Sequence, residues 1–141
     1  MDHIVYLDRK ANELQNLTDG KKSMIIRGAM GRKLPHGRVN KKDVLYFAEN
    51  SGDGLIKAKA IVEEVYHSDK LEKEVSIKLV EENQHKLLLN PQMFKRFAGK
   101  RYLVLINLTD FKELEPFKFD RSSYGNMDDW LPVEEIDSVK N

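Results

Sequence analysis

The sequence contains no cysteine, so disulfide bonds and thiolate metal sites are excluded. It also contains no apolar run close to the roughly 18 residues that a helix needs to cross a bilayer. The opening residues Met1–Val5 lack the basic and apolar regions of a secretory signal. We therefore expect a cytoplasmic protein with no membrane partner. With 141 residues, 40% hydrophobic and 33% charged, the chain is typical of a single domain, which we predict to span residues 1–141.

Metal-ligand spacing is also missing. The four histidines are scattered along the chain and do not form a pattern such as His-x-x-x-His: they are His3, His36, His67 and His85. Zinc sites in proteins place their ligands at short, regular spacings. We therefore expect no metal and no cofactor.

The net charge is small, but the charged residues are unevenly distributed along the chain. The net charge is only +1, which argues against a general nucleic-acid coat protein. Residues 21–42, however, contain eight basic residues and no acidic one: Lys21, Lys22, Arg27, Arg32, Lys33, Arg38, Lys41 and Lys42. Residues 109–141 contain nine acidic residues against four basic ones. Such a distribution binds anions locally, or else it marks two charged surfaces that are merely solvated or that pair with each other.

The apolar patterns predict a mixture of strands and helices. Strands are expected at residues 3–7, 23–26, 44–47, 55–66 and 101–108, with a short final strand at 133–136. Helices are expected at residues 8–18, 68–89 and 91–97. The stripe of the second helix is formed by Leu71, Val75, Leu79 and Val80. Residues 29–42 are predicted to form a long loop, and the chain after residue 108 is predicted to be largely irregular. The fold class is α+β: a small, partly open mixed β-barrel of about five or six strands with two or three flanking helices.

The segment from Arg27 to Arg38 is the first candidate site. It combines glycines, which let backbone amides approach a ligand, with arginines, which make bidentate contacts to phosphate or to guanine. It does not match the phosphate-binding loop, because no Gly-Lys-Ser/Thr follows at the required spacing. We expect Arg27, Arg32, Lys33 and Arg38 to bind an anion. A flexible, solvated connector is the alternative.

The residues before this loop resemble the ASCH domain family. The segment Gly20-Lys-Lys-Ser-Met-Ile-Ile-Arg27 is similar to the family pattern Gly-x-Lys-x-x-Glu-x-Arg, with matches at Gly20, Lys22 and Arg27. Ile25 stands where the family often has glutamate, and only Asp43 is retained from the Gly-Asp that follows in the family. The resemblance implies a PUA-like β-barrel with a cleft, Lys22 at the floor of that cleft, and RNA binding as the role.

Some small ASCH relatives look like amidases that act on acetylated cytidine through a lysine, a threonine and a glutamate. Their hydroxyl nucleophile occupies the position of Ile25, while Lys22 is present and Ser23 lies nearby. Alternation along a strand would point Ser23 away from Lys22, so a nucleophile moved there would not reach its base. If the chain is an enzyme, we expect Lys22, Ser23 and Glu63, with Glu64 as the alternative carboxylate, to form the site.

The second unusual segment runs from Tyr124 to Trp130 and includes Asp128 and Asp129. An aromatic ring of Trp130 or Tyr124 could stack on a base while one of the carboxylates accepts from an exocyclic amine. In the alternative interpretation, Trp130 anchors the C-terminal segment to the barrel.

The function predicted from these observations is an RNA- or nucleotide-binding module. Its predicted binding residues are Lys22, Arg27, Arg32, Lys33, Arg38, Tyr124 and Trp130. The first alternative is a nucleoside amidohydrolase or nuclease of the ASCH type. The second is a protein-interaction domain in which the basic loop and the acidic segment contact a partner chain.

Overall fold

The computed structural model describes residues 1–124 and 129–141. Within these residues the chain forms six strands and four α-helices, followed by one short 3-10 helix. The strands are β1 (Asp2–Leu7), β2 (Met24–Ala29), β3 (Val44–Glu49), β4 (Leu55–His67), β5 (Tyr102–Lys118) and β6 (Trp130–Glu134). The helices are α1 (Glu13–Thr18), α2 (Lys73–Glu82), α3 (Gln84–Leu87), α4 (Pro91–Phe97) and the 3-10 helix η1 (Ile136–Ser138).

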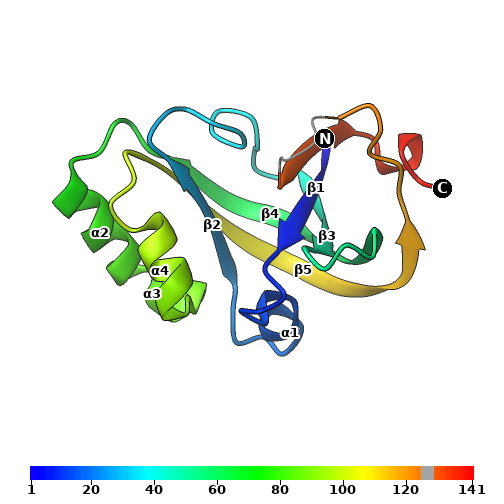
Figure 1. Cartoon of the computed structure of the whole chain (residues 1–141), viewed down its shortest axis with the longest axis horizontal. Coiled ribbons are helices and arrows are strands. Elements are labelled where there is room, and N and C mark those ends of the chain that lie inside the picture. Colours follow the sequence, from blue (N-terminus) through cyan, green and yellow to red (C-terminus); the bar gives the residue numbers. More distant parts are fainter. Residues whose placement is uncertain (125–128) are drawn as a thin grey trace.

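The strands form one curled, mixed sheet in the order β2-β5-β4-β3-β1-β6. Strands β1 and β3 run parallel, and the remaining pairs among the described strands are antiparallel. Register shifts interrupt the pairing of the two longest strands, β4 and β5, at three places. Such bulges bend and twist a strand, so the sheet curls into the half-barrel that Figure 1 shows. The predicted α+β, PUA-like barrel is therefore confirmed, with one helix more than expected.

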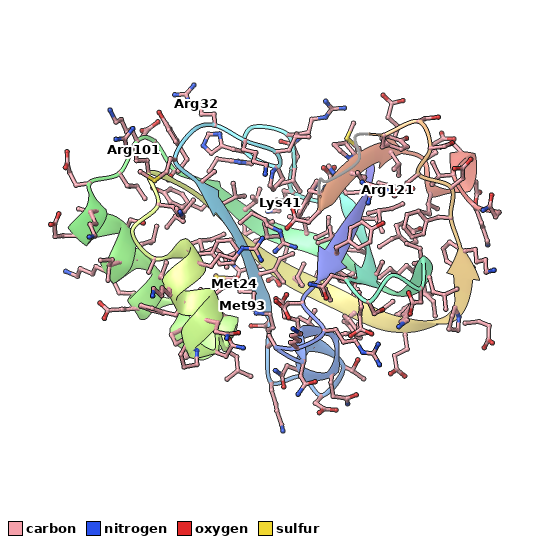
Figure 2. All side chains as sticks on the ribbon, viewed as in Figure 1. Met24, Arg32, Lys41, Met93, Arg101 and Arg121 are labelled. Atoms are coloured by element: carbon pink, nitrogen blue, oxygen red, sulfur yellow. The ribbon has the colours of Figure 1, made fainter. Side chains whose placement is uncertain are left out.

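The core lies on both faces of this sheet. The inner face of the curl carries the largest apolar cluster, which includes Val5, Ile25 and Phe47. Helices α2, α3 and α4 cover the outer face at the β2 and β5 end (Figure 1), where Met24 packs in the same cluster as Met93 of α4 (Figure 2). On β4, the predicted alternation is confirmed: the buried positions are Ile56, Ala58, Ala60 and Val62. The inner and outer clusters together fix β2, which carries the buried Arg27.

The helical region differs from its prediction. A single helix was expected over residues 68–89, but α2 begins only at Lys73, because the amides of Ser68 and Leu71 bond to carbonyls of residues 103 and 101 and keep this segment extended. The predicted apolar stripe is confirmed in part: Val80 is buried and Leu71 and Leu79 pack against the outer cluster, whereas Val75 is 52% exposed. The buried positions of α2 are Ser76 and Val80, and the Ser76 hydroxyl accepts the Gly99 amide. Ser76 thus occupies the buried face of α2 because its hydroxyl accepts a hydrogen bond from a backbone amide of the loop after α4.

The C-terminal half of the chain is more regular than predicted. Strand β5 continues to Lys118, and the final strand begins at Trp130 rather than at residue 133. The first helix begins at Glu13 because Asn12 adopts a left-handed conformation (φ 55°) and the Asp8 carboxylate accepts the Ala11 amide in a turn. The predicted start of α4 is confirmed, since the Asn90 side chain caps it. In the part of the chain that the structure describes, no helix is long and apolar enough to span a membrane.

Candidate functional site

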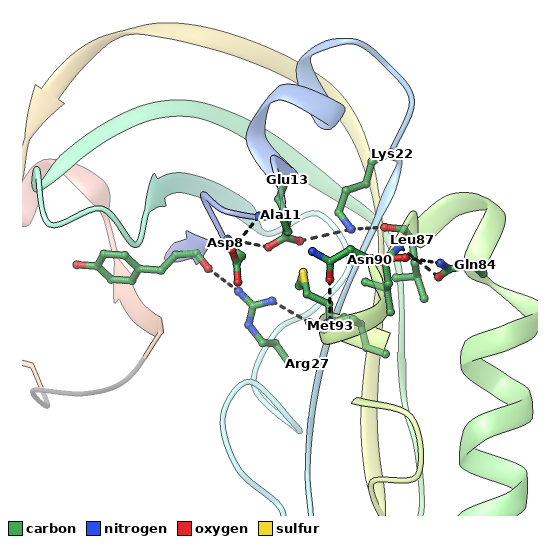
Figure 3. A network of polar contacts seen from close by, with 12 residues as sticks. Asp8, Ala11, Glu13, Lys22, Arg27, Gln84, Leu87, Asn90 and Met93 are labelled. Carbon is green, nitrogen blue, oxygen red and sulfur yellow. Dashed lines mark hydrogen bonds and ion pairs between the residues drawn. The ribbon is translucent and has the colours of Figure 1, made fainter. Parts of the chain in front are cut away.

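The curl of the sheet brings its β2 edge back towards β1, and the side chain of Arg27 bridges the gap. Arg27 Nη2 donates to the carbonyl oxygen of Tyr6 on β1 at 2.7 Å, and Nη1 donates to that of Ile26 at 2.8 Å (Figure 3). Strand β1 extends past the end of β6 here, which leaves the Tyr6 carbonyl available to the guanidinium. Arg27 is only 6% exposed, so a permanently charged group lies inside the seam of the half-barrel.

Two cavities adjoin at this seam. The outer cavity has a volume of about 130 Å³, and its lining comes from β2, the 29–42 loop, α4, β5 and the residue before β6. The lining residues are Arg27, Gly28, Ala29, Gly31, Lys33, Leu34, His36, Arg96, Phe97, Tyr102, Val104 and Asp129. The inner cavity has a volume of about 90 Å³ and is lined by Tyr6, Asp8, Glu13, Arg27, Asn50, Met93, Arg96, Phe97 and Asp129. The residues common to both are Arg27, Arg96, Phe97 and Asp129. Glycine is needed at position 28 of this wall, because a Cβ there would lie 2.7 Å from a methyl carbon of Leu103.

Asp129 lies between the two arginines. Its Oδ2 is 3.3 Å from Arg27 Nε and 3.7 Å from Arg96 Nη2. Its backbone oxygen accepts the Tyr6 amide at 3.0 Å, which fixes the main chain beside the seam. Nevertheless, Arg27 Nε is buried without a hydrogen-bond partner among the described residues. Arg27 Nε thus has an ion-pair partner but no hydrogen bond, and a ligand oxygen that replaced the Asp129 carboxylate could accept from it.

Lys22 lies behind the inner cavity and is 3% exposed. Its Nζ donates to the carbonyl of Leu87 and lies 3.4 Å from Glu13 Oε2 (Figure 3). Burial lowers the pKa of Lys22 below its ordinary value, and the neighbouring Glu13 carboxylate offsets only part of that effect. Glu13 also accepts the Asp8 amide at 2.8 Å. The predicted cleft-floor lysine is thus buried beneath the seam, where it joins α1, α3 and β2.

The basic loop contributes unequally to the site. Lys33 lines the outer cavity, whereas Arg32 lies over the ring of Tyr102 at 5.5 Å and projects at the outer edge of the molecule (Figure 2). Arg38 is exposed and lines neither cavity. Of the predicted basic residues, Arg27 and Lys33 therefore share one cavity, Arg32 reaches its rim, and Arg38 lies apart.

Two histidines attach this loop to β4 and the segment after it. His67 accepts the Gly37 amide at Nδ1 and donates from Nε2 to the Val39 carbonyl, while His36 Nε2 donates to the Ser68 carbonyl at 2.7 Å. The residues described by the structure contain no cluster of three or more potential metal ligands among histidine and acidic side chains.

Trp130 and Tyr124 do not occupy the predicted position beside a base. Trp130 is 1% exposed, and it donates from Nε1 to His3 Nδ1 at 3.0 Å. A ring with no exposed face cannot stack on a ligand, so the alternative, in which Trp130 anchors the C-terminal segment, fits the structure. Tyr124 is partly buried against the third apolar cluster and lines neither cavity. Asp128 lies outside the described residues.

His3 links Trp130 to Asp43 through two hydrogen bonds, one at each ring nitrogen. Because His3 Nδ1 accepts from Trp130, His3 Nε2 carries the proton and donates to Asp43 Oδ2 at 2.8 Å. Burial lowers the pKa of His3 from 6.5, and the Asp43 carboxylate opposes this only in part. Burial of Asp43 would raise its pKa, but hydrogen bonds from His3 and the Asn40 amide outweigh it and lower the pKa from 3.8.

These shifts predict a pH dependence of stability. The unfolded chain binds a proton at His3 near pH 6.5, whereas the folded chain binds it only at lower pH. Above pH 6.5 His3 is neutral in both states, and its contribution to the free energy of unfolding is fully present. That free energy should fall as the pH drops from 6.5 through the lower pKa of folded His3. His3→Gln should flatten this part of the curve, as measured by urea unfolding between pH 5 and 8. Parallel curves for the two proteins would contradict the assignment.

The residues proposed for an enzyme are not assembled. Lys22 is buried and held by Glu13, while Ser23 and Glu63 are exposed and line neither cavity. Ile25, at the nucleophile position of the amidase-like relatives, is fully buried in the inner apolar cluster. Glu64, the other candidate carboxylate, pairs with Lys41 at 2.9 Å.

Several residues of the site were not among the predicted binding residues. Arg96 and Tyr102 lie in or beside a further group of basic residues in the sequence, Lys95, Arg96, Lys100 and Arg101, and this group was the available signal. Asp129 stood beside the tryptophan in an unusual segment, but its pairing with Arg27 spans most of the chain. The sequence did not mark Glu13 as a site residue, because an acidic residue early in a helix is usually explained by its favourable interaction with the helix dipole.

The architecture is a curled half-barrel with a basic cavity at its seam. The chain has the fold of ASCH domains. The ASCH protein of Zymomonas mobilis superposes with a TM-score of 0.66 over 99% of this chain and 96% of its own, at 16% identity. A tyrosine-to-phenylalanine variant of it gives a TM-score of 0.71 over 97% and 93%, at 13% identity. A solved hypothetical protein gives 0.53 over 81% and 100%, at 14% identity. No family model matches the sequence, and no curated protein matches it either. The predicted resemblance is confirmed in the fold.

Proposed function

We propose that this chain is an RNA- or nucleotide-binding module of the ASCH type, and that the outer cavity holds an anionic group of the ligand. The observation that carries the proposal is the buried Arg27 Nε, which forms an ion pair with Asp129 at 3.3 Å but no hydrogen bond to any described residue. It lies beside a cavity lined by two further cations, Lys33 and Arg96. A guanidinium in such a position forms strong, charge-assisted bonds to phosphate oxygens. The ASCH fold supports the same ligand class.

The size of the cavity limits what enters it. An apolar cavity of about 150 Å³ holds one benzene molecule, so about 130 Å³ has room for one phosphate group but not for a duplex. Tyr102 lines the cavity with a half-buried ring, flanked by Arg32 and by His36 at 5.5 Å. In this proposal Tyr102, rather than Trp130, is the partly exposed aromatic ring that contacts the ligand, since Phe97 in the same lining is buried. Arg38 contributes only to the field that attracts the ligand.

Salt dependence tests the proposal directly. Binding of a labelled single-stranded RNA should weaken linearly on a logarithmic scale with salt, by about 0.7 per phosphate contacted. Lys33→Ala and Arg96→Ala should each reduce that slope by roughly this amount, because each removes one cation from the cavity. The measurement is fluorescence anisotropy at four salt concentrations.

Lys78→Ala is the matched control, because Lys78 is exposed on α2 and lines neither cavity. It should leave the slope unchanged. An affinity that stays constant between low and moderate salt would refute the proposal. Equal effects of the control and of the two cavity variants would locate RNA binding elsewhere, and a protein partner would then become the better interpretation of the basic loop.

A further inference from the structure

The position of Asp129 bears on which anion the outer cavity selects. Its carboxylate oxygen lies 3.3 Å from Arg27 and 3.7 Å from Arg96, which is where a ligand oxygen would have to lie to reach both guanidinium groups. The Asp129 side chain is 37% exposed, so it can rotate out towards solvent while its backbone stays bonded to Tyr6. The site thus already holds an anion, supplied by the chain itself.

The charges around the cavity indicate how strong a competing anion must be. Three basic side chains and one carboxylate line it, Arg27, Lys33, Arg96 and Asp129, which leaves a net charge of +2. A ligand of charge −1 that displaces Asp129 exchanges one carboxylate-like contact for another and gains little. A phosphate monoester carries a charge of about −1.5 to −2 at pH 7 and presents three terminal oxygens, so it gains from the exchange.

We infer that Asp129 makes the outer cavity selective for a terminal phosphate monoester over an internal phosphodiester. The inference rests on the proposed function and narrows its ligand to a phosphorylated RNA end or a free mononucleotide. Steric considerations agree, because an internal phosphodiester must lead two chain continuations out of a cavity of about 130 Å³, whereas a terminal phosphate leads out one. The Arg27 Nε–H, which Asp129 approaches but does not hydrogen-bond, becomes a donor to the phosphate.

The test compares three forms of one short single-stranded RNA. They carry a 5′-phosphate, a 5′-methyl phosphate of charge −1, or a 5′-hydroxyl, and a second set carries the same groups at the 3′ end. The wild-type protein should bind one phosphorylated form about tenfold or more tightly than its methyl ester, because only the monoester has the second charge. Competition by adenosine 5′-monophosphate and by inorganic phosphate shows whether the phosphate must be attached to RNA.

Asp129→Asn supplies the second readout. Removing the resident carboxylate should increase the affinity for the methyl ester and the hydroxyl form about tenfold, since internal phosphodiesters then enter without displacing an anion. Glu115→Gln changes the net charge equally at an exposed position of β5 that lines neither cavity, and should alter affinity less than about twofold.

The outcomes separate the two proposals. Equal binding of the phosphate and its methyl ester, or an Asp129→Asn protein that binds no more tightly than Glu115→Gln, would overturn this inference while Lys33- and Arg96-dependent RNA binding stands. Absence of salt-sensitive binding to every RNA form would instead overturn the proposed function.

Discussion

Glu13→Ala is expected to lower the free energy of unfolding by about 3–5 kcal/mol, the usual cost of removing one partner from a buried ion pair. Glu13 is 3% exposed and lies next to Lys22, also 3% exposed, and it accepts the Asp8 amide as well. Without it, the buried ammonium of Lys22 keeps the Leu87 carbonyl as its one remaining partner among the described residues. Urea unfolding at pH 7 measures the change.

Glu64→Ala is the matched control for this prediction. Glu64 pairs with Lys41 at 2.9 Å, but both side chains are largely exposed, so the loss should stay below about 1 kcal/mol. Adding Lys22→Met to Glu13→Ala should restore part of the stability, because it removes the uncompensated charge. A loss for Glu13→Ala no larger than that for Glu64→Ala would show that water reaches the pair.

Arg27→Ala should reduce affinity for single-stranded RNA by roughly 10- to 150-fold, which corresponds to losing a charge-assisted contact worth about 1.5–3 kcal/mol. Arg27→Lys should recover little of this affinity. A lysine keeps the charge but cannot bond the Tyr6 and Ile26 carbonyls while presenting a further donor to the ligand. Anisotropy at constant salt measures both proteins.

Because Arg27 also holds β2 against β1, its variants require a check of folding. Far-ultraviolet circular dichroism and urea unfolding establish the fraction of folded protein at the assay temperature. Arg96→Ala provides the comparison: Arg96 lines the same cavity with a side chain 56% exposed, so it should weaken binding with little loss of stability. Full RNA affinity in a folded Arg27→Ala protein would exclude Arg27 as the ligand's main contact.

Much of the fold follows from local patterns in the sequence. The alternation on β4 and the Asn90-Pro91 start of α4 produced the expected elements, because each depends on neighbours within a few residues. The second half of β5 did not, because register shifts and the positive φ of Asp110 (53°) reset the alternation there. The buried Ser76 was hidden for a related reason: its partner, Gly99, lies 23 residues away.

The site was less predictable than the fold. Arg27 and Lys33 were visible because the basic residues cluster in the sequence. The neutralising Asp129 and the buried Glu13 depend on how the curl closes, which no local pattern encodes. Trp130 was ambiguous, because a lone tryptophan beside acidic residues fits a ligand contact or an anchor equally well, and only its burial against His3 separates them.

The position of β1 in the sheet also affects how the chain reaches its native state. Strand β1 lies between β3 and β6, and Trp130 bonds to His3 across 127 residues. During synthesis β1 can pair with β3 early, but its second neighbour, β6, emerges from the ribosome only after β4 and β5. Contacts of such large sequence separation slow folding. Until then β1 presents one unpaired edge, the kind of surface that exposes a nascent chain to aggregation.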